Sequence, residues 1–155
     1  MDYSVEQRLL ALKLELPRPN PPAGNIVPYV VAGSLVFLSG QSTVWNGEPR
    51  FLGVVGREFG LEEAKEATRL CTLNLLAQLR EACGGDLNRV ERIVKVTGFI
   101  QVTDDFTDLP QAMNGASDLM VAVFGSHGTH SRTGVGVKNL PRGSAAVVEA
   151  VAAIA

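Results

Sequence analysis

Arg132 and Glu149, both in the last quarter of the chain, are the residues whose types and surroundings could do chemistry. Residues 131–137 alternate as a strand does, so Arg132 shares one face with Gly134 and Gly136. Two glycines beside an arginine are expected to leave open space where side chains normally pack. A guanidinium presents a planar fork that binds a carboxylate through two hydrogen bonds. The pattern predicts a small-molecule anion site at Arg132, with an ordinary surface or interface ion pair as the alternative.

Glu149 lies in the apolar stretch 145–154, where it shares a strand face with Val147 and Val151. A carboxylate that is taken out of water holds its proton more readily and can transfer it to a substrate. Glu149 is therefore a candidate acid or base. The alternative is a structural ion pair across a subunit interface.

Two histidines precede Arg132 in the segment 125–130. His127 and His130 could act as acid and base, or could hold a metal ion with a third ligand. The chain has 2 histidines in total, so a metal site would need carboxylates or a neighbouring subunit. We expect no metal, and we expect the histidines to lie at the rim of the pocket. The sequence has no Gly-x-Gly-x-x-Gly motif and no Walker-type lysine, so we also expect no cofactor.

These residues must be positioned by helices and strands, which the periodicity of the sequence predicts. A capping box at Ser4 begins a short helix, and Gly84 and Gly85 end a long amphipathic one. The turn at 141–143 predicts that the last two strands pair as an antiparallel hairpin. The expected order is a helix from residue 5, a proline-rich connector over 17–22, strands 29–32 and 35–41, a weak strand over 51–55, a helix over 61–83, a strand over 94–102, a helix from 109, and strands 131–137 and 145–154. This order indicates the α+β class, with a mixed β-sheet backed by two long helices.

The composition of the chain limits its partners. Its 155 residues suit one core, and 46% hydrophobic against 19% charged residues favour an oligomer that covers part of its surface. A net charge of −2 without a basic run argues against nucleic acid. No stretch approaches the ~20 apolar residues of a membrane span, and no signal peptide is evident, so we expect a cytoplasmic protein. Cys71 and Cys83 fall in one helix and are expected to be buried free thiols.

The C-terminal region has a distinctive set of residues at fixed spacing: Arg132, Val135, Val137, Leu140, Pro141, Glu149, Ala150 and Ala152. An upstream block, Val-Pro-Tyr-Val at 27–30 and Leu-Val-Phe-Leu-Ser-Gly-Gln at 35–41, accompanies it. Together they resemble the YjgF family, also called the reactive-intermediate (enamine/imine) deaminase or L-PSP endoribonuclease family. The resemblance covers residues 25–154, and the first residues are similar to an extension in a longer-chain branch. We therefore expect an N-terminal helix and proline-rich extension over 1–24 and a single α+β domain over 25–155.

The resemblance implies a chorismate-mutase-like α+β fold that assembles as a homotrimer, with its sites in clefts between subunits. In the family, the arginine that matches Arg132 binds the carboxylate of a small keto or imino acid. Tyr29, Ser39 and Asn114 match residues at the cleft, and the backbone near Gly134 is expected to help position a water. The implied reaction is hydrolytic deamination of enamine or imine acids such as 2-aminoacrylate, which gives a 2-keto acid and ammonia.

One departure from the family pattern bears on this reaction. The family usually has two glutamates two residues apart, and Val147 stands where the first is expected, so only Glu149 is kept. A non-catalytic protein that binds a small carboxylate in the same cleft therefore remains an alternative. An endoribonuclease is disfavoured by the acidic balance of the chain.

Overall fold

A computed structural model of the chain describes residues 4–155. None of the helices within these residues combines the length and the apolar character needed to cross a bilayer.

The predicted weak strand over 51–55 is wrong, because this segment forms isolated bridges only, among them one from Leu52 to Ser144. The helices and strands are α1 (Val5–Ala11), β1 (Tyr29–Ala32), β2 (Leu35–Ser42), β3 (Val44–Trp45), β4 (Glu48–Pro49), α2 (Leu61–Ala82), β5 (Val90–Gln101), α3 (Leu109–Phe124), β6 (Ser131–Val137) and β7 (Ala146–Ile154).

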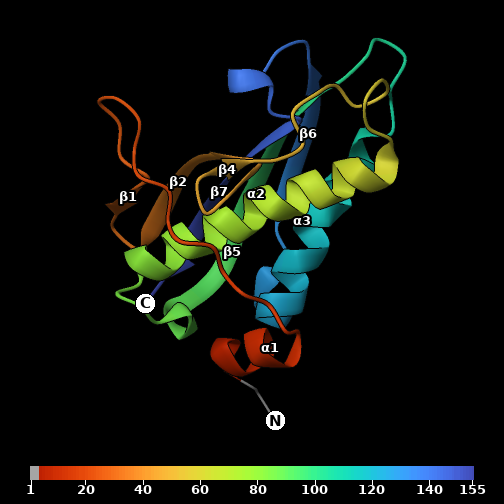
Figure 1. The fold of residues 1–155 in the computed structure, drawn as a ribbon. Helices are drawn as coiled ribbons and strands as arrows, with labels where there is room; N and C mark the ends of the chain where they lie inside the picture. The colour runs from red at the N-terminus through yellow and green to blue at the C-terminus, as the bar shows by residue number, and fades with distance from the viewer. Residues whose placement is uncertain (1–3) are drawn as a thin grey trace.

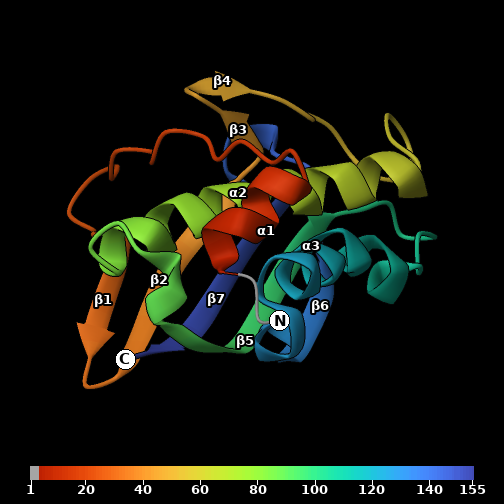
Figure 2. The same cartoon turned by 90° about the horizontal axis from the view of Figure 1, so that it is seen from below.

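The main sheet has five strands in the order β1-β2-β7-β5-β6. β5 and β6 run parallel, whereas the other neighbouring strands are antiparallel. Helix α2 leads into β5, helix α3 connects β5 to β6, and both helices lie on the same face of the sheet (Figures 1 and 2). The structure therefore confirms the α+β class and the mixed sheet backed by two long helices.

Helix α2 supplies the centre of the core. It begins with the Gly60 N–H donating to the side chain of Glu63 at 3.2 Å, which satisfies a free N–H of the first turn. Its buried stripe includes Leu75 and Leu79, which are both 0% exposed. The helix ends where Gly84 takes a φ of 68°, a left-handed conformation that glycine adopts without strain.

The other face of the sheet is not covered by any helix within residues 4–155 (Figure 2). Phe37 and Val135 lie on this face and are 46% and 37% exposed. They alternate with polar residues such as Lys95 and Thr97, which the strand register places on the same face. Exposed apolar side chains on a bare sheet face are typical of a surface that another chain covers.

The predicted hairpin of the last two strands is wrong. β6 and β7 are both strands, as expected, but β5 lies between them. The connection from β6 to β7 crosses the end of β5, where Gln101 fixes it. The side chain of Gln101 accepts the Leu140 N–H at 2.8 Å, and its backbone N–H donates to the Ala145 carbonyl at 2.9 Å. Alternation and turn residues predict strands, but they do not reveal that a distant strand inserts between them.

Helix α1 is held to the rest of the fold by polar contacts at its first turn. Its N-cap, Ser4, forms the predicted capping box with Gln7. Glu6 pairs with Arg80 of α2 at 2.9 Å, and the Val5 N–H donates to the Asn88 side chain at 2.8 Å.

The segment that follows α1 runs along α2 towards β1 (Figure 2). Asn20 fixes its middle: its carbonyl accepts from Gln78 Nε2 at 2.9 Å. The side-chain amide of Asn20 donates to Gln41 Oε1 at 3.2 Å and to Asn74 Oδ1 at 3.1 Å. The proline-rich connector is therefore hydrogen-bonded to α2 and β2.

Candidate functional site

Arg132 lies on the edge strand β6 and points to the side of the sheet that the helices cover. It is paired with the buried Val96 of β5, and its Nη1 donates to Asn114 Oδ1 at 2.8 Å and to Ser117 Oγ at 3.1 Å. Asn114 and Ser117 lie one turn apart on α3 and so share a face of that helix. The remaining guanidinium N–H groups make no hydrogen bond within residues 4–155 and are free to bind an anion.

A chain of hydrogen bonds continues from Arg132 to His130. Ser117 Oγ lies 2.9 Å from His130 Nε2, and His130 Nδ1 lies 2.6 Å from the Gly128 carbonyl oxygen. Because a carbonyl only accepts, Nδ1 carries a proton, and in the tautomer protonated at Nδ1 alone Nε2 accepts from the Ser117 hydroxyl. The Ser117 oxygen can then accept from Arg132. His130 therefore orients Arg132 through Ser117, a residue that sequence reasoning missed although its spacing from Asn114 is a usable signal.

His127 is separate from this chain of contacts. It lies exposed in the 3₁₀ turn Gly125–Gly128 that follows α3. Across the part of the chain that the structure describes, no three His, Cys, Asp or Glu residues group closely enough to hold a metal ion.

The space that the sequence predicts beside Arg132 is filled. A Cβ at Gly134 would lie 2.6 Å from Met113 Cγ, and a Cβ at Gly136 would lie 2.6 Å from Val102 Cγ2. Real side chains do not approach so closely, so these glycines let other side chains, including Met113 of α3, pack directly against β6. The expectation that the glycines leave a ligand space on this side is wrong, because helix–sheet packing occupies it.

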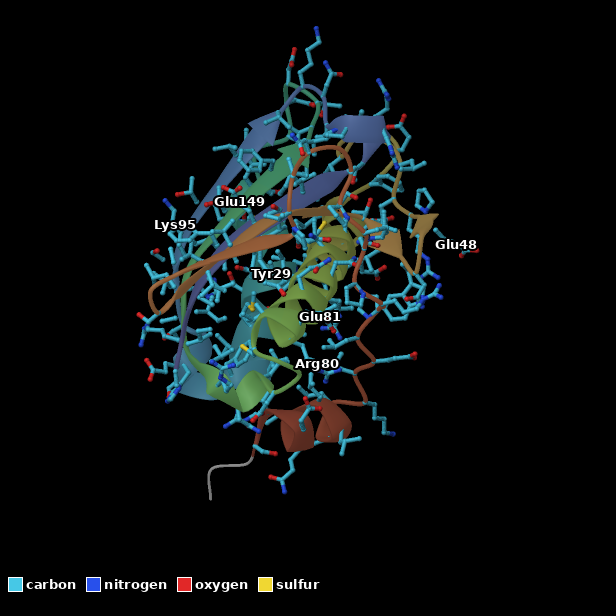
Figure 3. All side chains as sticks on the ribbon, turned by 90° about the vertical axis from the view of Figure 1, so that its left-hand side faces the viewer. Tyr29, Glu48, Arg80, Glu81, Lys95 and Glu149 are labelled. Atoms are coloured by element: carbon cyan, nitrogen blue, oxygen red, sulfur yellow. The ribbon has the colours of Figure 1, made fainter. Side chains whose placement is uncertain are left out.

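Glu149 lies on the opposite, open face of the sheet, where it is exposed. It pairs with Thr97, whereas Arg132 pairs with Val96, the preceding residue of β5. Since successive residues of a strand point to opposite faces, Arg132 and Glu149 point away from each other. Figure 3 shows Glu149 and Lys95 on the side of the sheet turned away from α2. Apolar side chains such as Val147 and Val151 share this face, but they do not bury Glu149 within its own chain.

Tyr29 and Ser39 lie near the edge of the sheet remote from Arg132. Tyr29 is half-buried in β1 and packs on the core, while Ser39 Oγ donates to the Val27 carbonyl at 2.7 Å. Three strands separate β1 from β6, which places them about 19 Å apart at a spacing of about 4.8 Å per strand. One chain therefore brings Arg132 together with Asn114 and His130, but not with Tyr29, Ser39 or Glu149.

A cavity of about 680 Å³ opens beside Ser39. Gly40 and Val147 form part of its wall, and a Cβ at Gly40 would lie 2.8 Å from Val147 Cγ1. Residues 20–23 and 26–28 of the N-terminal segment form another part of the wall. Sequence reasoning missed this cavity, because its walls come from segments near the two ends of the chain.

Cys71 and Cys83 take no part in these sites. Both are buried and free, as predicted, and burial raises the pKa of both thiols. The Cys71 thiol also donates to the Ala146 carbonyl at 3.4 Å. A buried, protonated thiol is inert, so neither cysteine is a nucleophile at neutral pH.

Comparison with known proteins identifies the family. The YjgF/chorismate-mutase-like endoribonuclease family matches residues 6–154. Protein TCP17 of Trypanosoma cruzi is 38% identical over 148 residues, which cover 95% of this chain and 92% of that protein. The crystal structure of protein Atu1372 from Agrobacterium tumefaciens is similar with a TM-score of 0.91 and 34% identity, over 97% of this chain and 92% of that one. Escherichia coli TdcF, solved with bound serine, is similar with a TM-score of 0.62 and 25% identity, over 89% of this chain and 94% of its own. The chain therefore belongs to the YjgF/chorismate-mutase-like family.

Proposed function

We propose that this protein binds a small carboxylic acid at Arg132 and hydrolyses its reactive imine or enamine form to a 2-keto acid and ammonia. The observation that carries the proposal is the setting of Arg132, whose Nη1 is held by Asn114 and Ser117 while its other N–H groups make no hydrogen bond within residues 4–155. A guanidinium held in this way fits a carboxylate through two hydrogen bonds. The serine bound by TdcF, a relative of this chain, is itself a small acid and supports the same ligand class.

The complete site belongs, in this proposal, to a cleft between two subunits of a homotrimer. Arg132 and Tyr29 lie at opposite edges of the sheet, and Glu149 lies on its open face. A second chain whose β1–β2 edge met the β6 edge of the first would bring these groups to one place. The exposed Phe37 and Val135 on the open face support such an assembly, because association would remove them from water.

The reaction divides into binding and proton transfer. Water adds to the imine carbon and forms a C–O bond; the C–N bond then breaks, and the nitrogen leaves as ammonia. Arg132 would hold the substrate carboxylate and so fix the position of the imine carbon. Over these two steps the water gives up both of its protons and the imine nitrogen gains two, and Glu149 and the Ser117–His130 pair are the candidates for these transfers.

A binding protein without turnover is the second candidate, and Val147 is the observation that favours it. Position 147 faces the cavity beside Ser39 with a side chain that cannot transfer protons. An endoribonuclease is a weaker candidate, since the net charge of −2 gives no electrostatic attraction for RNA.

The test is turnover of 2-aminoacrylate generated in place from serine by a pyridoxal-dependent dehydratase. We expect pyruvate release above the spontaneous rate with the wild type, loss of this excess in Arg132→Ala, and its retention in Arg69→Ala. Arg69 is an exposed arginine of α2 outside the site and serves as the matched control. Pyruvate binding without any acceleration would favour the binding protein, and absence of both would contradict the proposal.

A further inference from the structure

The cavity beside Ser39 is larger than a three-carbon acid requires. Its volume of about 680 Å³ falls within the range of roughly 300–1,000 Å³ typical of pockets that hold drug-sized ligands. We propose that this cavity receives the side chain of a 2-keto or 2-imino acid whose side chain is apolar and has about four or more carbons. The inference rests on the proposed function, because the same cleft would hold the carboxylate and the reacting carbon.

The wall of the cavity is mainly apolar. Ile26, Val27 and Leu52 line it and are 60%, 53% and 51% exposed in the free chain. A ligand side chain against them would remove this surface from water, together with its own. Burial of one methylene group improves affinity about three- to fourfold, so a longer apolar side chain should bind more tightly.

The charge of the wall restricts the ligand further. Arg142 is the one charged residue that lines the cavity within residues 4–155, and no carboxylate faces it there. A basic side chain would therefore find no partner in the cavity and would be repelled by Arg142. The charge therefore disfavours a basic side chain, and the mainly apolar wall favours an apolar one.

The N-terminal wall is fixed before any ligand arrives. The Ser39 N–H and hydroxyl donate to the Pro28 and Val27 carbonyls at 2.9 and 2.7 Å. Asn20 binds the Gln41 side chain at 3.2 Å. A wall that is already ordered loses little conformational entropy on binding, which favours affinity.

Val147 completes the apolar character of the cavity. Its Cγ1 would lie within 2.8 Å of a Cβ at Gly40, so the valine covers the glycine and closes this part of the wall. A glutamate at position 147 would place a carboxylate against the apolar wall. The departure from the family pattern at Val147 therefore fits a site adapted to an apolar side chain.

The first test measures the affinity of the whole protein for stable 2-keto acids of rising length by isothermal titration calorimetry. The series is pyruvate, 2-oxobutanoate, 2-oxopentanoate and 2-oxohexanoate. We expect Kd to fall about three- to fourfold with each added methylene, which makes 2-oxohexanoate roughly 30- to 60-fold tighter than pyruvate. Equal affinity across the series, or weaker binding of the longer acids, would overturn the inference.

The second test places a bulky group in the cavity. Ala23→Phe fills it from the N-terminal wall, whereas Ala11→Phe puts the same side chain at the exposed end of α1, outside the cavity. Ala23→Phe should remove most of the advantage of 2-oxohexanoate over pyruvate, and Ala11→Phe should retain it. An unchanged advantage in Ala23→Phe would locate the apolar subsite elsewhere and overturn the inference.

Arg132→Ala separates this inference from the proposed function. If Arg132→Ala binds pyruvate as tightly as the wild type, the proposed function fails. If Arg132→Ala loses pyruvate binding but chain length has no effect in the wild type, the apolar-side-chain inference alone fails.

Discussion

Arg132 and Glu149 point to opposite faces of the same sheet, since Arg132 pairs with Val96 and Glu149 pairs with the next residue, Thr97. They cannot contact one substrate molecule from within a single chain. In its own chain Arg132 donates to Asn114 and to Ser117, and Ser117 is linked to His130. If Arg132 and Glu149 act on the same substrate, they come from different chains.

The first prediction concerns assembly. We expect the homotrimer that the family resemblance implies; the exposed apolar side chains on the open face of the sheet, and the division of the candidate site between two edges, both favour association. Light scattering at micromolar concentration should give three times the mass of the chain. Phe37→Lys should dissociate the trimer, whereas Val121→Lys, on the exposed side of α3, should not. A monomeric wild type would contradict this prediction.

The second prediction concerns the support of Arg132. Ser117→Ala removes the hydroxyl that joins the guanidinium to His130, so Arg132 should be held less firmly. A net hydrogen bond contributes about 0.5–1.5 kcal/mol, which corresponds to a loss of pyruvate affinity of roughly 2- to 13-fold. Calorimetry checks the value, and His127→Ala should change nothing because His127 is exposed. Equal affinities of Ser117→Ala and the wild type would show that the contact has no positioning role.

Local signals in the sequence predict the helices and strands well. They predict poorly which strands lie next to each other in the sheet. The capping box at Ser4, the apolar stripe of α2 and the glycine at position 84 all act within a few residues, and the structure has each of them. The insertion of β5 between β6 and β7 depends on contacts between distant segments, such as that of Gln101 with Leu140. No local sequence pattern predicts these long-range contacts.

The candidate site shows the same difference between what local signals predict and what depends on contacts between distant segments. Residue type and the family resemblance both point to Arg132, and its contact with Asn114 joins two predicted residues. The glycine pattern predicts open space at Gly134, but a glycine equally permits a close approach, and Met113 makes that approach. The cavity wall supplied by residues 20–28 is formed by long-range packing, which the sequence alone does not reveal.

The third prediction concerns proton transfer. Val147→Glu places a carboxylate beside the cavity, at the position where the family resemblance implies a glutamate. A general acid or base contributes typically 10²–10⁴-fold, so turnover of 2-aminoacrylate should rise measurably. Affinity for 2-oxohexanoate should fall in the same variant, because the carboxylate replaces part of an apolar wall. A rate that stays at the wild-type value would show that position 147 is not near the reacting atoms.

The fourth prediction concerns the dependence of stability on pH. Burial raises the pKa of Cys71 and Cys83, so the folded protein keeps protons that the unfolded thiols release above about pH 8.5. The free energy of unfolding should therefore be unaffected by these groups below that pH and should fall as the pH rises above it, by up to about 1.4 kcal/mol per pH unit for each thiol. Urea denaturation between about pH 9 and 10.5 should show a shallower fall in Cys71→Ala than in the wild type. Equal slopes in the two proteins would contradict a raised thiol pKa.

The central claim is that Arg132 binds the carboxylate of the substrate, and pyruvate titration of Arg132→Ala tests it most directly. Loss of a partly desolvated charge pair costs about 2–5 kcal/mol of binding free energy, so Arg132→Ala should bind pyruvate at least 30-fold more weakly. Arg69→Ala should bind pyruvate as the wild type does, and circular dichroism should show that both variants are folded. A folded Arg132→Ala protein with wild-type affinity for pyruvate would contradict the account.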